Sequence, residues 1–264
     1  MLEEVLEVEG GLEDLETQIT ALGSQSGAVG PHLFDESAVR LHAPVTRPQK
    51  LIGIGLNYFD HAQEAGIAVP KTPLLFGMYA NAITGPDTPI VLPAVSEKVD
   101  YEAELAIVIG SRARNVPVEN ALRYVAGYTI VHDVSARDLQ FSEKQWLRGK
   151  SVDTFAPMGP YLVTRAALKD ADGLAIGLRL NGRTMQQSNT RNLIFKVPAL
   201  VSHISQTMTL EPGDVIATGT PAGVGYVRNP PVFLKPGDVV EIEIEGIGIL
   251  RNSVSGPSHP NNQL

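Results

Sequence analysis

An unbroken apolar run, Leu105–Ile109, ends at Gly110 and constrains the fold of this chain more than any other segment. Such a run, bounded by a glycine, is typical of a strand that is covered on both faces. Two carboxylates, Glu102 and Glu104, stand at its head. Because alternate side chains of a strand point the same way, we expect the two carboxylates side by side on one face.

The pair Glu102 and Glu104 has two interpretations. Like charges at the mouth of an apolar run repel one another and are costly to desolvate unless a cation lies between them. Oxygen-only ligation favours Mg²⁺, with Mn²⁺ or Ca²⁺ as substitutes. The alternative is a solvent-facing pair at a strand end, and the spacing alone favours that alternative.

Asp133 is a candidate third oxygen ligand, because it ends the β-branched strand predicted over Gly127–Asp133. Strand alternation directs the neighbouring His132 away from it, so we interpret His132 as structural.

Cations and an amide follow Asp133 in the sequence: Arg137, Gln140, Arg148 and Lys150. Arginine pairs with carboxylates through two parallel hydrogen bonds, and lysine polarises an oxygen. Carboxylates surrounded by such cations indicate an anionic, chelating substrate.

Residues 57–66 are predicted to form a short helix, capped by Asn57 or Asp60 and ended by a glycine. On this helix His61 and Glu64 are neighbours at i and i+3. A carboxylate beside an imidazole raises its basicity, which suits a general base that activates water. The alternative is a surface pair on a mobile helix. A proline-containing loop follows, which favours a lid.

The composition is that of an ordinary globular chain, with 264 residues, 43% of them apolar, and a mean hydropathy of +0.02. A net charge of −8 argues against nucleic acid or an anionic membrane as the main partner. Without cysteine, disulfides and thiolate metal sites are excluded. The acidic N-terminus and the lack of a long apolar run predict neither a signal peptide nor a transmembrane helix, so we expect a cytoplasmic protein.

The chain is predicted to divide into a small N-terminal lobe (1–49), a main catalytic domain (50–254) and a flexible tail (255–264). The lobe has a possible helix over 12–22 and a loop over 23–27. A strand over 50–56 contains glycines where the backbone must be approached closely. A helix is expected over 118–125, and the second half is mostly strands: 159–164, 174–180, 214–218, 238–245 and 247–250. The glycine-rich segment 219–225 lacks the spacing and the lysine of a phosphate loop. Its glycines and the Thr220 hydroxyl are expected to line a pocket with backbone N–H groups.

Several motifs together give the chain a resemblance to the fumarylacetoacetate hydrolase family, and they occur in the family's order from residue 50 to about 254. They are Asn57-Tyr58-x-Asp60-His61-x-x-Glu64, Tyr101-Glu102-Ala103-Glu104-Leu105-Ala106, His132-Asp133-Val134-Ser135-Ala136-Arg137-Asp138-Leu139-Gln140, Gly149-Lys150-Ser151-x-Asp153-Thr154-Phe155-Ala156-Pro157-Met158-Gly159-Pro160, and Pro212-Gly213-Asp214-Val215-Ile216-x-Thr218-Gly219-Thr220-Pro221-x-Gly223-Val224-Gly225.

The resemblance implies a mixed, mainly β (α+β) fold, a rolled sheet with short peripheral helices, assembled as a homodimer. It also implies Mg²⁺ or Mn²⁺ on Glu102, Glu104 and Asp133. By the same carry-over, His61 and Glu64 form a water-activating dyad on a lid. The substrate's oxygens are then held by Arg137, Gln140, Lys150 and Thr220.

We therefore predict a metal-dependent hydrolase that cleaves a carbon–carbon bond in an acylpyruvate-type 1,3-diketo acid, with His61, Glu64 and Lys150 as catalytic residues. The alternative on the same site is a decarboxylase or isomerase of oxaloacetate or of a 2-oxo-ene-dicarboxylate from aromatic ring cleavage. The third hypothesis is a non-catalytic module that binds a keto acid or a metal.

Overall fold

The computed structural model of the chain describes residues 38–257 and seven positions before them: Val5, Leu6, Val8, Gly11, Asp14, Leu15 and Thr17. The helix predicted over 12–22 is described only at three of these positions, which are helical. The predicted loop over 23–27 and the end of the tail, 258–264, lie outside the described residues. The division into an N-terminal lobe and a catalytic domain stays a prediction.

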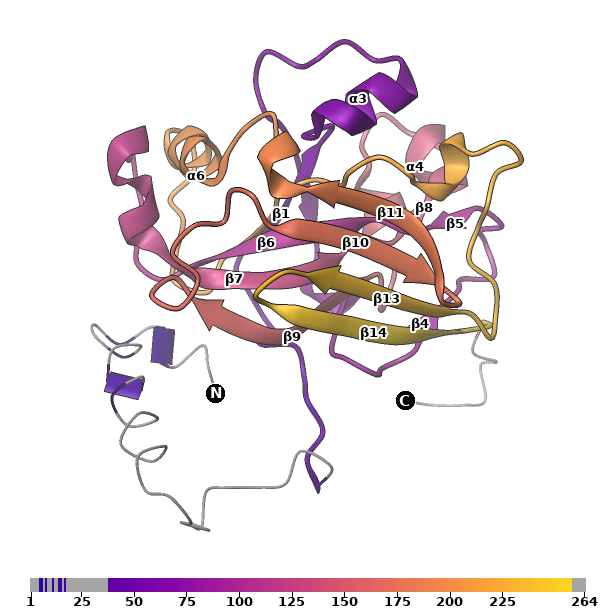
Figure 1. Cartoon of the computed structure of the whole chain (residues 1–264), viewed down its shortest axis with the longest axis horizontal. Helices are drawn as coiled ribbons and strands as arrows, with labels where there is room; N and C mark the ends of the chain where they lie inside the picture. The colour runs from indigo at the N-terminus through magenta and orange to yellow at the C-terminus, as the bar shows by residue number, and fades with distance from the viewer. Residues whose placement is uncertain are drawn as a thin grey trace.

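The described residues form two large sheets and one small one (Figure 1). The first has the order β2 (Leu74–Met78), β1 (Leu51–Gly55), β12 (Val215–Ala217), β6 (Ala103–Ile109), β7 (Val125–His132), β9 (Ala156–Thr164) and β3 (Ile83–Thr84). The second has the order β11 (Arg183–Asn189), β10 (Ala175–Leu180), β13 (Val239–Ile244), β14 (Gly248–Ser255) and β4 (Ile90–Val91). A short pair, β5 (Val99–Asp100) and β8 (Ser135–Ala136), completes them.

The helices are short and lie around the sheets. Within residues 38–257 they are α3 (Phe59–Ala65), α4 (Arg137–Ser142), α5 (Leu147–Lys150) and α6 (Val197–Ser205), with 3₁₀ turns at Ala80–Ala82, Val118–Tyr124, Thr190–Asn192 and Gly225–Val227. In Figure 1, α6, α3 and α4 lie along the upper edge of the sheets, with α6 at the left and α3 and α4 further right. The mixed α+β fold with rolled sheets that the sequence predicted is confirmed.

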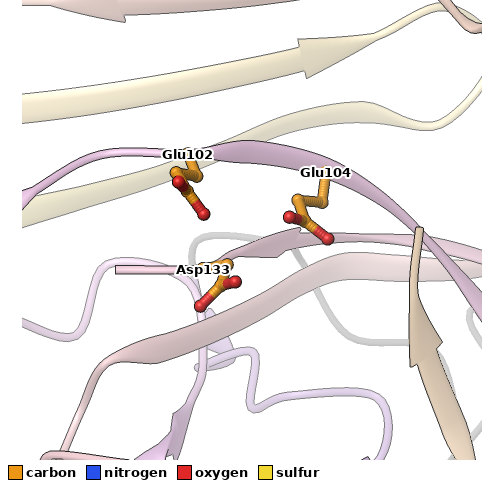
Figure 2. Close-up of side chains that lie close together, drawn as sticks. All are labelled: Glu102, Glu104 and Asp133. Atoms are coloured by element: carbon orange, nitrogen blue, oxygen red, sulfur yellow. The ribbon is translucent and has the colours of Figure 1, made fainter. Parts of the chain in front are cut away.

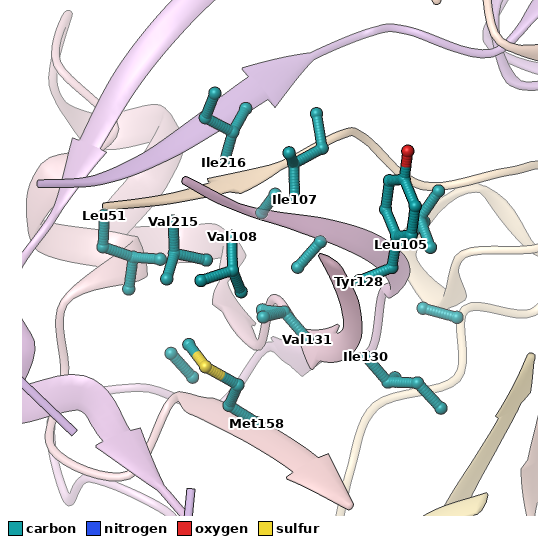
Figure 3. Packing of buried hydrophobic residues seen from close by; sticks show 14 of the residues in the cluster. Leu51, Leu105, Ile107, Val108, Tyr128, Ile130, Val131, Met158, Val215 and Ile216 are labelled. Carbon is teal, nitrogen blue, oxygen red and sulfur yellow. The ribbon is translucent and has the colours of Figure 1, made fainter. Parts of the chain in front are cut away.

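The core is built on β6 and β7, whose residues are all buried. Apolar side chains from both strands pack with those of β1, β9 and β12 (Figure 3). Each fully buried aliphatic side chain contributes roughly 1.5–3 kcal/mol relative to an exposed one. The strand predicted from the apolar run is therefore confirmed, with a start at Ala103.

Two local predictions differ from the structure. The segment after Pro117 is a 3₁₀ helix and not an α-helix. The N-cap of α3 is Tyr58, because the Asn57 side chain is used elsewhere: it donates to the carbonyls of Thr218 and Phe195. The predicted end of α3 is confirmed, since Gly66 adopts the left-handed conformation that caps a helix (φ 63°).

The glycines predicted to be closely approached in β1 are confirmed as such. A Cβ at Gly53 would lie 2.1 Å from the ring of Phe76, and one at Gly55 would lie 2.7 Å from the ring of Trp146. The two aromatic rings pack on each other with centroids 5.4 Å apart. Because Gly53 and Gly55 have no side chains, the rings of Phe76 and Trp146 can pack directly against the backbone of β1 as an aromatic wall.

Candidate active site and metal centre

The antiparallel register of β6 and β7 brings the three predicted ligands together. Ala103 pairs with His132, so Glu102 and Asp133, one residue beyond this pair on each strand, lie opposite each other. The Asp133 N–H donates to the Glu102 carbonyl at 3.0 Å. One carboxylate oxygen of Glu102, Glu104 and Asp133 can be chosen so that all three lie within 4.8 Å of one another. Figure 2 shows the three carboxylates facing one another.

The Lys150 ammonium bridges two of these carboxylates. Its Nζ lies 2.6 Å from Glu102 Oε2 and 2.5 Å from Asp133 Oδ2, and it is buried together with them. Although burial alone would lower the pKa of Lys150, Asp133 and Glu102 raise it above its usual value. The side chain is therefore a fixed positive charge at neutral pH.

The Arg137 guanidinium is held from three sides. Nε donates to Asp100 Oδ2 at 2.9 Å, Nη2 donates to Glu102 Oε1 at 2.6 Å, and Nη1 donates to Gln140 Oε1 at 2.9 Å. The ring of Tyr226 covers it, with the guanidinium carbon 4.5 Å from the ring centroid. These contacts fix the planar group at the edge of the carboxylate cluster.

The cluster fits a divalent cation. Four buried carboxylates (Asp100, Glu102, Glu104 and Asp133) face two buried cations (Arg137 and Lys150), which leaves two negative charges without a partner among the described residues. Asp133 Oδ1 is buried and has no hydrogen-bond partner there. An orphaned carboxylate oxygen in such a cluster matches the hard oxygen ligands that Mg²⁺ and Mn²⁺ prefer.

The pKa values record the same excess of negative charge. Burial, together with Asp133 and Glu102, raises the pKa of Glu104 well above its usual range. Burial also raises the pKa of Asp133 to about 7, although the Lys150 ammonium opposes the rise. Glu102 differs, because Arg137 and Lys150 outweigh burial and lower its pKa to about 2. When no cation is bound, Glu104 therefore favours the neutral form, and Asp133 changes its charge near neutral pH.

The predicted dyad lies beside the cluster. His61 Nδ1 is 3.5 Å from Glu64 Oε2, and the imidazole is buried. Both oxygens of Glu64 accept from the Gly223 N–H, at 3.0 and 2.9 Å. Because Nδ1 faces Glu64, Nε2 is the nitrogen left for a reactant.

Of the glycine-rich segment 219–225, Thr220 lines the cavity as predicted, but the glycines do not. Their backbone N–H groups bind the protein's own carboxylates: Gly219 donates to Glu104, Gly223 to Glu64, and Gly225 to Asp100. These donors are engaged by side chains of the site and not left for a ligand. The segment thus orients three acidic side chains at once.

A cavity of about 310 Å³ contains the predicted site residues. Its polar part is lined by His61, Glu102, Glu104, Asp133, Arg137, Gln140, Lys150 and Thr220, and its apolar part by Ile54, Ile67, Leu74, Phe76, Phe141 and Trp146. Glu64 does not line it but contacts His61. The structure therefore places these side chains together, and their individual roles stay predictions.

Arg148, one of the predicted cations, and His132, which we interpreted as structural, lie outside the cavity. Arg148 is exposed and pairs with Glu143 on the surface, because its place on α5 directs it away from Lys150. His132 is buried on β7 and does not line the cavity, as strand alternation predicted. Burial lowers its pKa to about 3, so it is neutral.

Sequence reasoning gave no role to Asp100 and Tyr226, which hold Arg137. Alternation offered a signal for Asp100, because it lies two residues before Glu102 just as Glu104 lies two residues after. No comparable signal marks Tyr226, which reaches Arg137 from a distant segment.

The model of the fumarylacetoacetate (FAA) hydrolase C-terminal family matches residues 50–255, which is most of the chain and includes every residue of the site. The chain belongs to this family. Among solved structures, the fumarylacetoacetate hydrolase from Exiguobacterium antarcticum superposes with a TM-score of 0.80 at 45% identity, covering 86% of this chain and 82% of that one. The 5-carboxymethyl-2-hydroxymuconate delta-isomerase from Mycobacterium smegmatis gives a TM-score of 0.76 at 43% identity, covering 86% of both chains.

Among relatives in the family, "Oxaloacetate tautomerase fahd2, mitochondrial" from Xenopus laevis is 48% identical over 94% of this chain and 76% of its own length. The human "Oxaloacetate tautomerase FAHD2A, mitochondrial" is 49% identical over 84% of this chain and 71% of its own length. Of these four proteins, two are named oxaloacetate tautomerases, one is named an isomerase and one a hydrolase. The tautomerase and isomerase names support the predicted alternative better than acylpyruvate hydrolysis. No helix in the described part of the chain has the length and hydropathy needed to cross a membrane.

Proposed function

We propose that this enzyme interconverts the keto and enol forms of oxaloacetate, or of a 2-oxo dicarboxylate close to it in size and charge. The observation that carries the proposal is that a buried candidate base, His61, lines the same cavity as three clustered carboxylates and two cations. Relatives named as oxaloacetate tautomerases, at 48% and 49% identity, support this reaction over others.

Tautomerisation moves a proton from C3 of the 2-oxo acid to its C2 oxygen and consumes no water. His61 Nε2 takes the C3 proton, Glu64 stabilises the imidazolium through Nδ1, and the imidazolium then returns the proton to the C2 oxygen. A divalent cation held by Glu102, Glu104 and Asp133 would supply the Lewis acidity that makes this proton easier to remove. The positive charge of Lys150 offsets negative charge that develops on the C2 oxygen.

The substrate's carboxylates require hydrogen-bond donors and positive charge. Arg137, Gln140 and Thr220 line the polar part of the cavity and provide both. Burial of these groups strengthens each contact with an anion, because the local dielectric is low. Assembly as a homodimer remains a prediction.

The test is to follow the loss of enol absorbance of freshly dissolved oxaloacetate with wild-type enzyme and Mg²⁺ or Mn²⁺, and in parallel with a chelator. We expect equilibration with metal and enzyme together to be faster than with either alone, and no more release of pyruvate or CO₂ than with metal alone. The His61→Asn variant should lose about 100-fold in rate, the scale of general acid–base catalysis, and keep its metal. Because free metal ions also enolise oxaloacetate, the Glu104→Gln variant with metal is the control. Equal rates with and without wild-type enzyme would refute the proposal.

Acylpyruvate hydrolysis is a second candidate, favoured by the Glu64 carboxylate beside His61, since such a pair also deprotonates water. Cleavage of an acylpyruvate to pyruvate and a carboxylic acid, measured in the same cuvette series, distinguishes the two reactions.

A further inference from the structure

We propose that Gln186 is a positioning residue of this site, which sets the direction in which the Thr220 hydroxyl donates its proton. The inference rests on the proposed function in one respect, since it assumes that the cavity holds an anionic 2-oxo acid. Gln186 lies on β11 of the second sheet, is 1% exposed, and is not among the side chains that line the cavity.

The Gln186 amide uses all of its strong hydrogen-bonding groups inside the protein. Oε1 accepts from the Ala103 N–H at 2.9 Å, and Nε2 donates to Thr220 Oγ1 and to the Pro221 carbonyl, both at 2.8 Å. Two of the partners are backbone groups whose roles are fixed, one a donor and one an acceptor. The amide therefore has one possible orientation, and Thr220 Oγ1 receives a proton from it.

The orientation of the amide determines what the Thr220 hydroxyl can do. A hydroxyl carries one proton and two lone pairs, and Gln186 occupies one lone pair. Within residues 38–257 the Thr220 hydroxyl donates to no protein acceptor, and the side chain lines the cavity. Its proton is thus available to an oxygen of the ligand, and Gln186 keeps the hydroxyl from accepting there instead.

The other end of the same amide supports the metal centre. Ala103 lies between Glu102 and Glu104, and its N–H is bound by Gln186 and not by a neighbouring strand. One buried side chain thus links the backbone between two candidate metal ligands to a hydroxyl that lines the cavity. An unmade bond at such a buried amide is costly, which favours a single geometry.

A double-mutant cycle tests the inference, with oxalate as the probe because it presents the adjacent oxygens of a 2-oxo acid without reacting. Oxalate binding to the Mg²⁺-loaded enzyme is measured by calorimetry for wild type, Gln186→Met, Thr220→Val and the double variant. Loss of a hydrogen bond to a charged ligand weakens binding by about tenfold, so each single variant should lose about tenfold. The affinity of the double variant for oxalate should be at most twofold weaker than that of Thr220→Val alone.

Two further variants separate positioning from damage to the fold. Gln187→Met, at the exposed neighbour of Gln186, is the matched control and should bind oxalate as wild type does. Gln186→Glu retains the acceptor for the Ala103 N–H but cannot donate to Thr220. Its affinity for oxalate should therefore fall as much as that of Gln186→Met. The affinity for Mg²⁺ alone, measured without oxalate, should change by less than about threefold in Thr220→Val.

Additive losses in the double variant would overturn the inference, because Gln186 would then act independently of Thr220. Unchanged oxalate affinity in Gln186→Met, or no oxalate binding by wild type, would also overturn it. Consider the case in which the double-mutant cycle gives the expected oxalate affinities although the wild-type enzyme does not speed the loss of the oxaloacetate enol. That combination would refute the proposed function and leave the role of Gln186 intact.

Discussion

The Gly223 N–H donates to both carboxylate oxygens of Glu64, at 3.0 and 2.9 Å. Through this contact, the segment that carries Thr220 holds the helix that carries His61. A second contact fixes the start of α3, where Asp60 accepts from the Ser188 hydroxyl of β11. The predicted lid is thus held at two points over the cavity, and its opening requires both contacts to break.

Two substitutions at Glu64 should distinguish the effect of its negative charge on His61 from the effect of its contact with the Gly223 N–H, which we call the tether. Glu64→Gln keeps an oxygen for the Gly223 N–H but loses the negative charge beside His61, so we expect tautomerisation to fall about tenfold. Glu64→Ala also releases α3 and should fall about 100-fold. Hydrogen exchange of residues 59–66 should accelerate in Glu64→Ala and not in Glu64→Gln. Equal exchange in the two variants would contradict the tether.

Glu104→Gln should abolish the stabilisation of the protein by metal. At a metal concentration of a hundred times Kd, a bound ion adds about 2.7 kcal/mol to the stability of the folded state. The raised pKa of Glu104 shows that the metal-free site favours the neutral side chain, so the neutral variant should unfold at or above the Tm of metal-free wild type. Thermal unfolding with and without Mg²⁺ measures both effects. The exposed Glu143→Gln serves as control, and a retained Mg²⁺ shift in Glu104→Gln would disprove this ligand set.

Acidification should weaken metal binding below about pH 7. Burial raises the pKa of Asp133 to about 7, so the metal-free site carries a proton there at lower pH, and that proton must leave before the carboxylate can bind a cation. With one competing proton the affinity falls about tenfold per pH unit, and more steeply where Glu104 is also protonated. Glu102, with a pKa of about 2, stays ionised and adds no proton to this window. Calorimetry of Mg²⁺ binding in two buffers of different ionisation enthalpy measures the number of protons that are released on binding. A Mg²⁺ affinity that stays constant from pH 6 to pH 8 would exclude the coupling between metal binding and proton release.

Gly53→Ala should displace the aromatic wall of the cavity. A Cβ at Gly53 would lie 2.1 Å from the Phe76 ring, so the ring must move, and overpacking of this kind costs about 1–3 kcal/mol. The Lys150 ammonium lies 5.2 Å from the centroid of that ring, so substrate KM should rise as well. Urea unfolding measures the stability change. Gly77→Ala, on the adjacent strand with open space around it, is the matched control, and equal stability of the two variants would argue against a close approach at Gly53.

The sequence predicted elements whose cause is local. The apolar run of β6 specifies a buried strand, and Gly66 supplies the left-handed residue that ends α3. By contrast, β11 was missed, because Arg183–Asn189 contains one apolar residue, Met185, and has no alternating pattern. Pairing with β10 makes it a strand, and that is a tertiary effect.

The site residues also divide into those that local sequence could place and those that only the tertiary structure places. Spacing placed Glu102 and Glu104 on one face, but only the register that pairs Ala103 with His132 brings Asp133 opposite Glu102. The hydrogen bond from Gln186 to Thr220 joins β11 to the segment that follows β12, across 34 positions of sequence, and has no local signature. Likewise, the N–H groups of the glycine-rich segment could be counted from sequence, but their acceptors could not be named.

Trp146 lines the cavity against Phe76 and is the single tryptophan of the chain. When the protein is excited at wavelengths that tyrosine does not absorb, its intrinsic emission therefore originates at one known point on the cavity wall. A ligand that fills the cavity changes the polarity around that indole, so the fluorescence of the unlabelled enzyme reports binding. The rate of ligand entry can therefore be measured by stopped-flow mixing, even with compounds that are not turned over.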